Sequence, residues 1–458
     1  MTFTAFSAHA KKFYEGKLYV ILCLACVLLG NVTGADVLFA IPVILLTFCG
    51  CFFCHDLRFF LVPLCTFTCI IPLSHTPYVP TESDFYFSGA MPYLIGVAAF
   101  FLVGGLVYFM VRNRKSAARL SIKKPSLLWG FLAFSLALAL NGAFFPANWL
   151  KNIGYGIGIA ASFLAVYIFF AIFHPRTKEN AEHFLFTMAA LGICVFAELV
   201  ILYLTKVEFA GFIPVKNTIM IGWGIWTHIG ALLSVCLPCM LYFAHSKKRW
   251  LPSMLCAALL FIGIFMTASR GAWLYGGIML LICLIYLCIS GKNRKKNRIL
   301  CIALVGVALL AGIFLFEKIL NYVMAFMQVG FSDNGRFELW RTAWSAFLAR
   351  PVFGVGFFNA GITLGGFPPI MPYLYHNTVL QMLGSCGAVG FLLYAFHRAQ
   401  TVSLLIRKRR SPIALFLLFS VAALVLTSLT DEHLFHIYPA FWYAIALFFA
   451  EGEYGESL

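Results

Sequence analysis

The sequence predicts an all-α fold: a polytopic transmembrane helical bundle of about 14 spans, or 12 at the lowest count. Its 458 residues are 62% hydrophobic and only 11% charged, and the mean hydropathy is +0.92. Soluble domains carry about 25% charged residues, so a water-soluble core could not bury this much apolar surface. The composition therefore excludes a cytosolic enzyme, a secreted domain and a disordered chain.

Successive apolar runs mark the individual spans, because about 20 helical residues cross the hydrocarbon core of a bilayer. The expected spans are residues 14–30, 35–54, 59–73, 90–111, 126–144, 152–173, 183–204, 220–244, 250–267, 271–290, 299–317, 377–397, 412–429 and 434–450. The first and third runs are the shortest.

The basic residues alternate between the two sides of these spans. The chain has 33 Lys and Arg against 17 Asp and Glu, a net charge of +16. Of the 33, 25 fall in one set of alternate loops and 8 in the other. Because cytoplasmic loops carry the excess of Lys and Arg, we expect both termini to be cytoplasmic. The positive charge thus indicates membrane orientation and not a nucleic-acid partner.

One outer loop is far longer than the others. It covers residues 318–375 and holds Arg336, Arg341 and Arg350, whose charge the orientation rule does not explain. Aromatic residues at spacings of three and four predict an amphipathic helix that begins at Arg336 and stops before Pro351. A glycine-rich segment then returns to the membrane, and long loops of this kind are usually functional.

Four segments follow one another between residues 220 and 395. They are Gly-Trp-Gly-Ile-Trp-Thr-His at 222–228, Ser-Arg-Gly at 269–271, Arg336 and Trp340 followed by Pro-Val-Phe-Gly-Val-Gly at 351–356, and His376-Asn377 followed by Gly-Ala-Val-Gly at 387–390. Together they resemble the signature of O-antigen ligases, O-antigen polymerases and related oligosaccharyltransferases. His228 stands where that family usually has Asn, so the resemblance transfers no role to it.

This resemblance implies a bacterial glycosyltransferase of the inner (cytoplasmic) membrane with its active site on the outer face. The donor would be a saccharide on undecaprenyl diphosphate, and the acceptor a hydroxyl of another saccharide, of lipid A core or of a protein. We expect no cofactor. The chain then divides into an N-terminal bundle (1–219), a catalytic region with the outer loop 318–375 (220–397) and a C-terminal hairpin (398–458).

The reaction breaks an anomeric C–O bond and releases a lipid diphosphate. We expect Arg270, Arg336 and Arg341 to neutralise this leaving group in place of a metal ion, because guanidinium binds phosphate through a fixed fork. His376 opens a span at the same face, where a neutral imidazole would hydrogen-bond or deprotonate the acceptor hydroxyl. Attack opposite the diphosphate would invert the anomeric centre.

Four more residues are expected at the substrate: Asn377, Gly354, Gly356 and Glu198. The two glycines form either a backbone turn or a phosphate cradle. Glu198 lies within a span, where a charge is costly and usually functional, either at the site or as a structural partner. No metal site is expected, because neighbouring carboxylates such as Asp431 and Glu432 would diverge on a helix.

A transporter or flippase of a lipid-linked saccharide is the alternative from another class. Transporters place charged or helix-breaking residues near mid-membrane and often contain internal repeats. Here Glu198 is the single such carboxylate, no repeat is evident, and basic residues gather in one outer loop. The sequence therefore favours the enzyme. The segment at 222–228 favours a polymerase, while ligase and oligosaccharyltransferase stay open.

Overall fold

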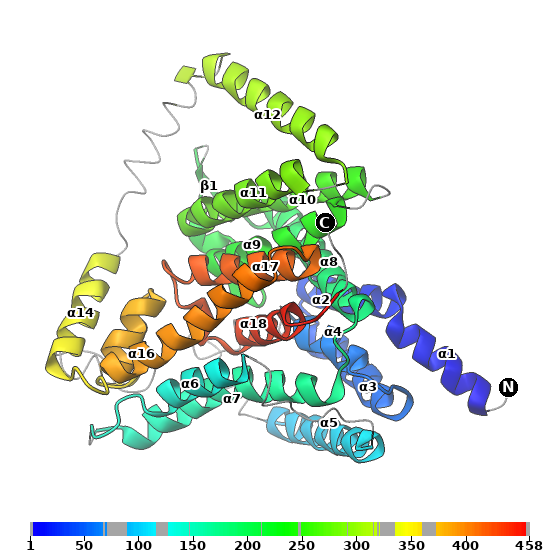
Figure 1. Cartoon of the computed structure of the whole chain (residues 1–458), viewed down its shortest axis with the longest axis vertical. Coiled ribbons are helices and arrows are strands. Elements are labelled where there is room, and N and C mark those ends of the chain that lie inside the picture. The colour runs from blue at the N-terminus through cyan, green and yellow to red at the C-terminus, as the bar shows by residue number, and fades with distance from the viewer. Residues whose placement is uncertain are drawn as a thin grey trace.

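A computed structural model describes residues 3–66, 69–70, 89–115, 127–145, 147–211, 213–245, 249–290, 292–314, 316–317, 320, 335–359 and 372–454. These residues form a helical bundle, as the sequence predicts (Figure 1). The N-terminal half contributes α1 (Phe3–Glu15), α2 (Lys17–Thr33), α3 (Asp36–Phe53), α4 (Arg58–Thr66), α5 (Met91–Asn113), α6 (Leu128–Ala139), α7 (Trp149–Phe173) and α8 (Lys178–Thr205). The C-terminal half contributes α9 (Trp226–Ala244), α10 (Trp250–Met266), α11 (Arg270–Ser290), α12 (Arg294–Phe314), α14 (Arg336–Ala349), α16 (Thr378–Arg407), α17 (Pro412–Thr427) and α18 (Ile437–Ala450).

Each expected span corresponds to one of these helices, although not all are long enough to cross a bilayer. Within the described residues, seven helices have the length and composition of a membrane span, or eight if α1 and α2 form one bent span. Four shorter apolar helices lie among them. The expected span at 59–73 is represented by α4, which has only 9 residues. The count of about 14 crossings therefore stays a prediction.

Two small hairpins precede α9. Strand β1 (Phe209–Ala210) pairs antiparallel with β2 (Ile213–Pro214), and β3 (Met220–Ile221) pairs with β4 (Gly224–Ile225). A short 3-10 helix, η4 (Lys216–Thr218), joins the two hairpins. The expected span at 220–244 is therefore too long at its start, because its first six residues form the second hairpin.

Helix α9 lies at the centre of the C-terminal half and packs against α8, α10, α11 and α17. In its most apolar 18-residue stretch, 89% of the residues are buried. Small residues permit this packing: a Cβ atom at Gly230 would lie 2.6 Å from the Cβ atom of Ala272 in α11. Close approach at small residues is a common device for joining membrane helices, and here it brings the start of α11 beside the start of α9.

Helix α16 is broken at Gly387, whose φ is 67° and ψ is −169°. The segment 351–356 fills the break, and its backbone pairs with α16: Val355 N donates to Gly384 O at 3.0 Å, and Ala388 N donates to Pro351 O at 2.7 Å. A side chain at Gly387 would clash with the carbonyl of Val352. Two motifs of the sequence therefore form one structure: the segment 351–356 fills the break in α16 that Gly387 creates.

The expected amphipathic helix of the outer loop is present as α14. It packs against α16, with Ala343 and Ala346 buried at the contact. Gly335 precedes it with φ 74°. The sequence also predicts Asp333 or Asn334 as the cap of this helix, and both lie outside the described residues. Figure 1 shows α14 at one side of the bundle and α1, with the N-terminus, at the opposite side.

Candidate functional site

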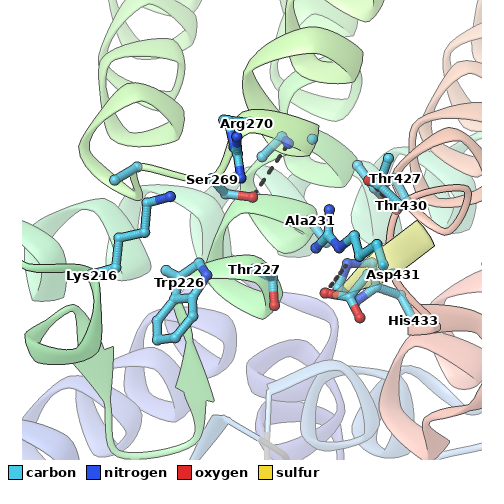
Figure 2. A pocket seen from close by; sticks show the side chains of 14 residues that line it. Lys216, Trp226, Thr227, Ala231, Ser269, Arg270, Thr427, Thr430, Asp431 and His433 are labelled. Atoms are coloured by element: carbon cyan, nitrogen blue, oxygen red, sulfur yellow. Dashed lines mark hydrogen bonds and ion pairs between the residues drawn. The ribbon is translucent and has the colours of Figure 1, made fainter. Parts of the chain in front are cut away.

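A cavity that is partly open to solvent lies among helix ends (Figure 2). Its wall combines basic, hydroxyl and carboxylate side chains. The lining residues are Lys216, Trp226, Thr227, Ala231, Ala268, Ser269, Arg270, Gly271, Ala272, Arg336, Thr427, Thr430, Asp431 and His433. Of the four residues expected to be catalytic, Arg270 and Arg336 therefore lie in this wall.

The Ser-Arg-Gly segment at 269–271 has a clear local structure. Ser269 ends the turn after α10, and its Oγ accepts a hydrogen bond from Ala272 N at 3.4 Å, which caps α11. Arg270 is the first residue of α11 and reaches the cavity. A side chain at Gly271 would clash with Thr430 Oγ1. The glycine thus allows the α17–α18 connection, which carries Asp431, to lie against Arg270.

Three helix N-termini meet at the cavity. Trp226 and Thr227 open α9, Arg270 opens α11 and Arg336 opens α14. Helix N-termini carry partial positive charge and attract anions. The buried Thr227 Oγ1 has no hydrogen-bond partner within the described protein. The wall around Arg270 and Arg336 therefore favours an anionic ligand.

Lys216 adds a third cationic side chain, one that was not among the expected site residues. It lies on η4 between the two hairpins. Burial lowers its pKa, and the nearby Arg270 and Arg336 lower it further. Three cations from three separate elements thus face one another closely enough to repel, and a polyanion would relieve that repulsion.

The hairpin that leads into α9 rests on Glu198. This carboxylate is 3% exposed and accepts hydrogen bonds from Asn31 Nδ2 at 3.0 Å and from Trp223 Nε1 at 3.5 Å. Glu198 does not line the cavity. Its contacts fit the structural alternative, through support of Trp223 just before Trp226 and Thr227. Direct substrate binding by Glu198 stays a prediction.

The two arginines of α14 face different surroundings. Arg336 is half-buried and lines the cavity, whereas Arg341 is exposed and lies outside the lining. The five-residue spacing places their side chains on different sides of the helix. Of the two, the geometry supports Arg336 as the ligand-facing residue.

His376 and Asn377 form the entry to α16. His376 has a positive φ of 51°, and Asn377 caps the helix: its Oδ1 accepts from Val379 N at 2.9 Å and from Leu380 N at 3.0 Å. The Asn377 amide also donates to Leu429 O at 2.8 Å. These contacts occupy the Asn377 side chain as a helix cap, and substrate binding by it stays a prediction.

The carboxylates of Asp431 and Glu432 both reach His376. The His376 Nδ1 atom lies 2.9 Å from Asp431 Oδ1 and 2.6 Å from Glu432 Oε2. The expected divergence of these two side chains is wrong, because residues 431–432 lie in the turn between α17 and η5 (His433–Phe435) and not on an α-helix. His376 itself does not line the cavity, but its partner Asp431 does.

This pairing changes the expected charge of His376. Burial alone would lower the His376 pKa, but the hydrogen bonds and charges of Asp431 and Glu432 outweigh it and raise the pKa to about 10. The expected neutral imidazole is therefore corrected: His376 is a cation at neutral pH. Burial would raise the Asp431 pKa, but the neighbouring His433 and His376 hold it well below its usual range. Burial and the Asp431 charge raise the Glu432 pKa.

Three more histidines pack behind Asp431. The ring of His228 lies 5.6 Å from that of His433 and 5.1 Å from that of His436, both edge-to-face. Burial lowers the His433 pKa to about 4, so this ring is neutral at physiological pH. Its Nε2 lies 3.9 Å from Asp431 Oδ2. These rings shield Asp431 from solvent while adding no fixed charge.

Gly354 and Gly356 contact protein on every side that a side chain would occupy. Both have positive φ, 69° and 84°. A Cβ atom at Gly354 would clash with the Ser385 backbone, and one at Gly356 with the Asn152 side chain. They are required for the turn that fills the break in α16. Their role as a phosphate cradle stays a prediction.

One set of side chains within the described residues could hold a metal ion. The donor atoms of His376, Asp431 and Glu432 lie within 4.8 Å of one another. Two carboxylate oxygens and one imidazole nitrogen suit a divalent cation in principle. The close contacts to His376 Nδ1 equally suit an ion pair, and metal independence stays a prediction.

Asp431, Glu432 and Lys216 are the residues that sequence reasoning missed as parts of the site. A signal was present for the first two, because a Thr-Asp-Glu-His run interrupts two strongly apolar helices at 430–433. Buried charge in such a place is usually paired. No comparable signal distinguished Lys216 from other loop lysines.

Comparison with known families adds one finding. Residues 255–395 match the family model described as O-Antigen ligase. This stretch runs from α10 to the first part of α16 and includes Arg270, Arg336 and His376. Two other lining residues, Lys216 and Asp431, come from outside this stretch and lie on opposite sides of the cavity. A comparison with curated proteins gave no match.

Proposed function

Because residues 255–395 carry an O-antigen ligase domain, we propose that this multi-pass membrane protein is a glycosyltransferase. It transfers a saccharide from undecaprenyl diphosphate to an acceptor hydroxyl at the outer face of the bacterial inner membrane, without a metal ion and with inversion at the anomeric carbon. The observation that carries the proposal is the cavity in which Lys216, Arg270 and Arg336 meet three helix N-termini.

The cationic wall is the site of the donor diphosphate. Arg270 and Arg336 provide planar donor forks, Lys216 provides a point charge, and the first turns of α9 and α11 provide positive dipole ends. Negative charge grows on the diphosphate as the anomeric C–O bond breaks. Donors fixed in advance stabilise that charge without reorganisation, which is often the largest contribution to catalysis.

The opposite wall is the acceptor side. Asp431 and His433 line it, and His376 stands behind Asp431 at hydrogen-bond distance. The His376 side chain is 38% exposed, so its Nε2 can donate to an oxygen of the acceptor. As an imidazolium it also balances the negative charge of Asp431. We propose that His376 orients the acceptor hydroxyl toward the anomeric carbon.

The transporter alternative predicts a charged cavity near the middle of the membrane. Among the described residues, the cavity lies at helix termini, and its cations are the first residues of α11 and α14 together with a residue of the hairpin connection. Glu198, the carboxylate inside a span, is occupied by Asn31 and Trp223. These positions favour an enzyme at the membrane surface.

The test uses the purified full-length protein with undecaprenyl-diphosphate oligosaccharides extracted from membranes of the source cell. A product ladder from donor alone indicates a polymerase, and product only after a second acceptor is added indicates a ligase. We expect Arg270→Lys to reduce transfer about 100-fold or more, because lysine keeps the charge but loses the paired donors. Full activity of this variant, or transport of the lipid without transfer, would contradict the proposal.

A further inference from the structure

We propose that Asp431 is the residue that accepts the proton of the acceptor hydroxyl, with His376 as its hydrogen-bonded partner. The inference rests on the proposed glycosyl transfer and assigns a role that the sequence had given to His376. It depends on two features: the position of Asp431 on the cavity wall and the different contacts of its two oxygens.

Asp431 is the one carboxylate that lines the cavity among the described residues. In Figure 2, Asp431 and His433 lie on one side of the cavity and Lys216 lies on the other, with Arg270 between the two sides. A sugar placed between these walls has its diphosphate toward the cations and its other face toward Asp431. An inverting transfer needs this arrangement, because the acceptor attacks opposite the leaving group.

The two oxygens of Asp431 differ in their contacts. Oδ1 accepts hydrogen bonds from Glu432 N at 3.0 Å and pairs with His376 Nδ1 at 2.9 Å. Oδ2 lies 3.9 Å from His433 Nε2, beyond hydrogen-bond distance. Asp431 also shares a side-chain hydrogen bond with Glu432. Oδ1, with its two contacts to Glu432 N and His376 Nδ1, is the oxygen that sets the orientation of the carboxylate, and we assign Oδ2 as the oxygen that receives the proton.

The neighbouring groups are poorly placed for this task. His376 does not line the cavity, and its Nδ1 is occupied by the carboxylates of Asp431 and Glu432. Glu432 is 5% exposed, lies against His376 Nδ1 and does not line the cavity. His433 lines the cavity but is a neutral, deeply buried ring. Asp431 alone combines access with a negative charge.

The acceptor oxygen forms a bond to the anomeric carbon while the bond from that carbon to the diphosphate oxygen breaks, and its electron pair leaves with the lipid diphosphate. The acceptor oxygen becomes strongly acidic as it bonds to carbon, so a weakly basic carboxylate suffices. Its proton moves to Asp431 Oδ2 and passes to water when the product leaves.

Azide distinguishes proton acceptance by Asp431 from a structural role. It is a nucleophile with no proton to lose, so it needs no proton acceptor. With the extracted lipid-linked donor, we expect Asp431→Asn and Asp431→Ala to lower transfer to hydroxyl acceptors at least about 100-fold. The Asp431→Ala variant in sodium azide should then release lipid diphosphate and form a glycosyl azide of inverted configuration. Donor binding and thermal unfolding of both variants are measured in parallel.

Glu338→Gln is the matched control, because Glu338 is an exposed carboxylate on α14 outside the cavity, and its activity should equal that of wild type. Asp431→Asn with more than a tenth of wild-type transfer would overturn the assignment. So would a folded, donor-binding Asp431→Ala that makes no glycosyl azide. A wild-type protein that releases no lipid diphosphate would instead overturn the proposed function, and the assignment with it.

Discussion

Substitution of Gly230 by Ala tests whether the contact between α9 and α11 sets the position of Arg270. A Cβ atom at Gly230 would lie 2.6 Å from Ala272 Cβ, 3.1 Å from Thr267 Oγ1 and 3.5 Å from Ser269 Cβ. Ordinary contacts begin at 3.4 Å, so the start of α11 must move by about 0.8 Å, because Ala272 Cβ is fixed to the backbone. All three contacts lie within three residues of Arg270.

A displacement of about 1 Å at a reacting group can cost about 100-fold in rate. We therefore expect Gly230→Ala to lower transfer by about 10- to 100-fold, and overpacking to destabilise the fold by about 1–3 kcal/mol. The assay is transfer from the extracted lipid-linked donor, followed by gel separation of products, with a thermal unfolding curve for each variant.

Two further variants make the test specific. Gly277→Ala in α11 is the control, because a Cβ atom there meets nothing within 4 Å, and it should keep full activity. Ala272→Gly removes the opposing Cβ atom, so the double variant should recover most of the activity of Ala272→Gly alone, as coupled sites do. Full activity of folded Gly230→Ala, or no recovery in the double variant, would refute the reasoning.

Three other predictions follow from the same structure. His376→Ala should lose at least about 100-fold in transfer yet still bind donor, because one fixed donor to the reacting group is removed. The folded-state pKa of His376 is raised to about 10, so its ion pair contributes fully to stability below the unfolded pKa near 6.5 and is lost as pH rises through 10. Wild-type transfer should therefore fall near pH 10, and a constant rate to pH 11 would contradict this prediction. Excess EDTA should leave transfer intact, whereas inhibition reversed by Mg²⁺ or Mn²⁺ would assign a metal to His376, Asp431 and Glu432. In a cysteine-depleted protein, an impermeant thiol reagent on intact cells should label Ser345→Cys and not Arg409→Cys, both exposed positions, and the reverse pattern would invert the topology.

The helices and their order follow from local pattern. Long apolar runs can satisfy their backbone in lipid only as helices, so each expected span is met by a helix, and the aromatic spacing after Arg336 is sufficient to predict α14. Arg270 and His376 were also identifiable from sequence, since each stands at the end of an apolar run in a recognisable segment. The start of α9 was misplaced because a two-residue strand pair leaves little periodic signal. Some helix ends also differ from the expected spans, as at α6, which ends at Ala139.

Contacts between distant segments were decided by tertiary structure alone. Asp431 and Glu432 join His376 across 55 or more positions of sequence, and Lys216 joins Arg270 and Arg336 from a hairpin. The charge of His376 depends on those two carboxylates, which no local rule places beside it. Local pattern therefore determined which helices form and which helix ends carry charge. Packing at Gly230, Gly271 and Gly387 decided which of those ends meet, and with that the protonation state of His376.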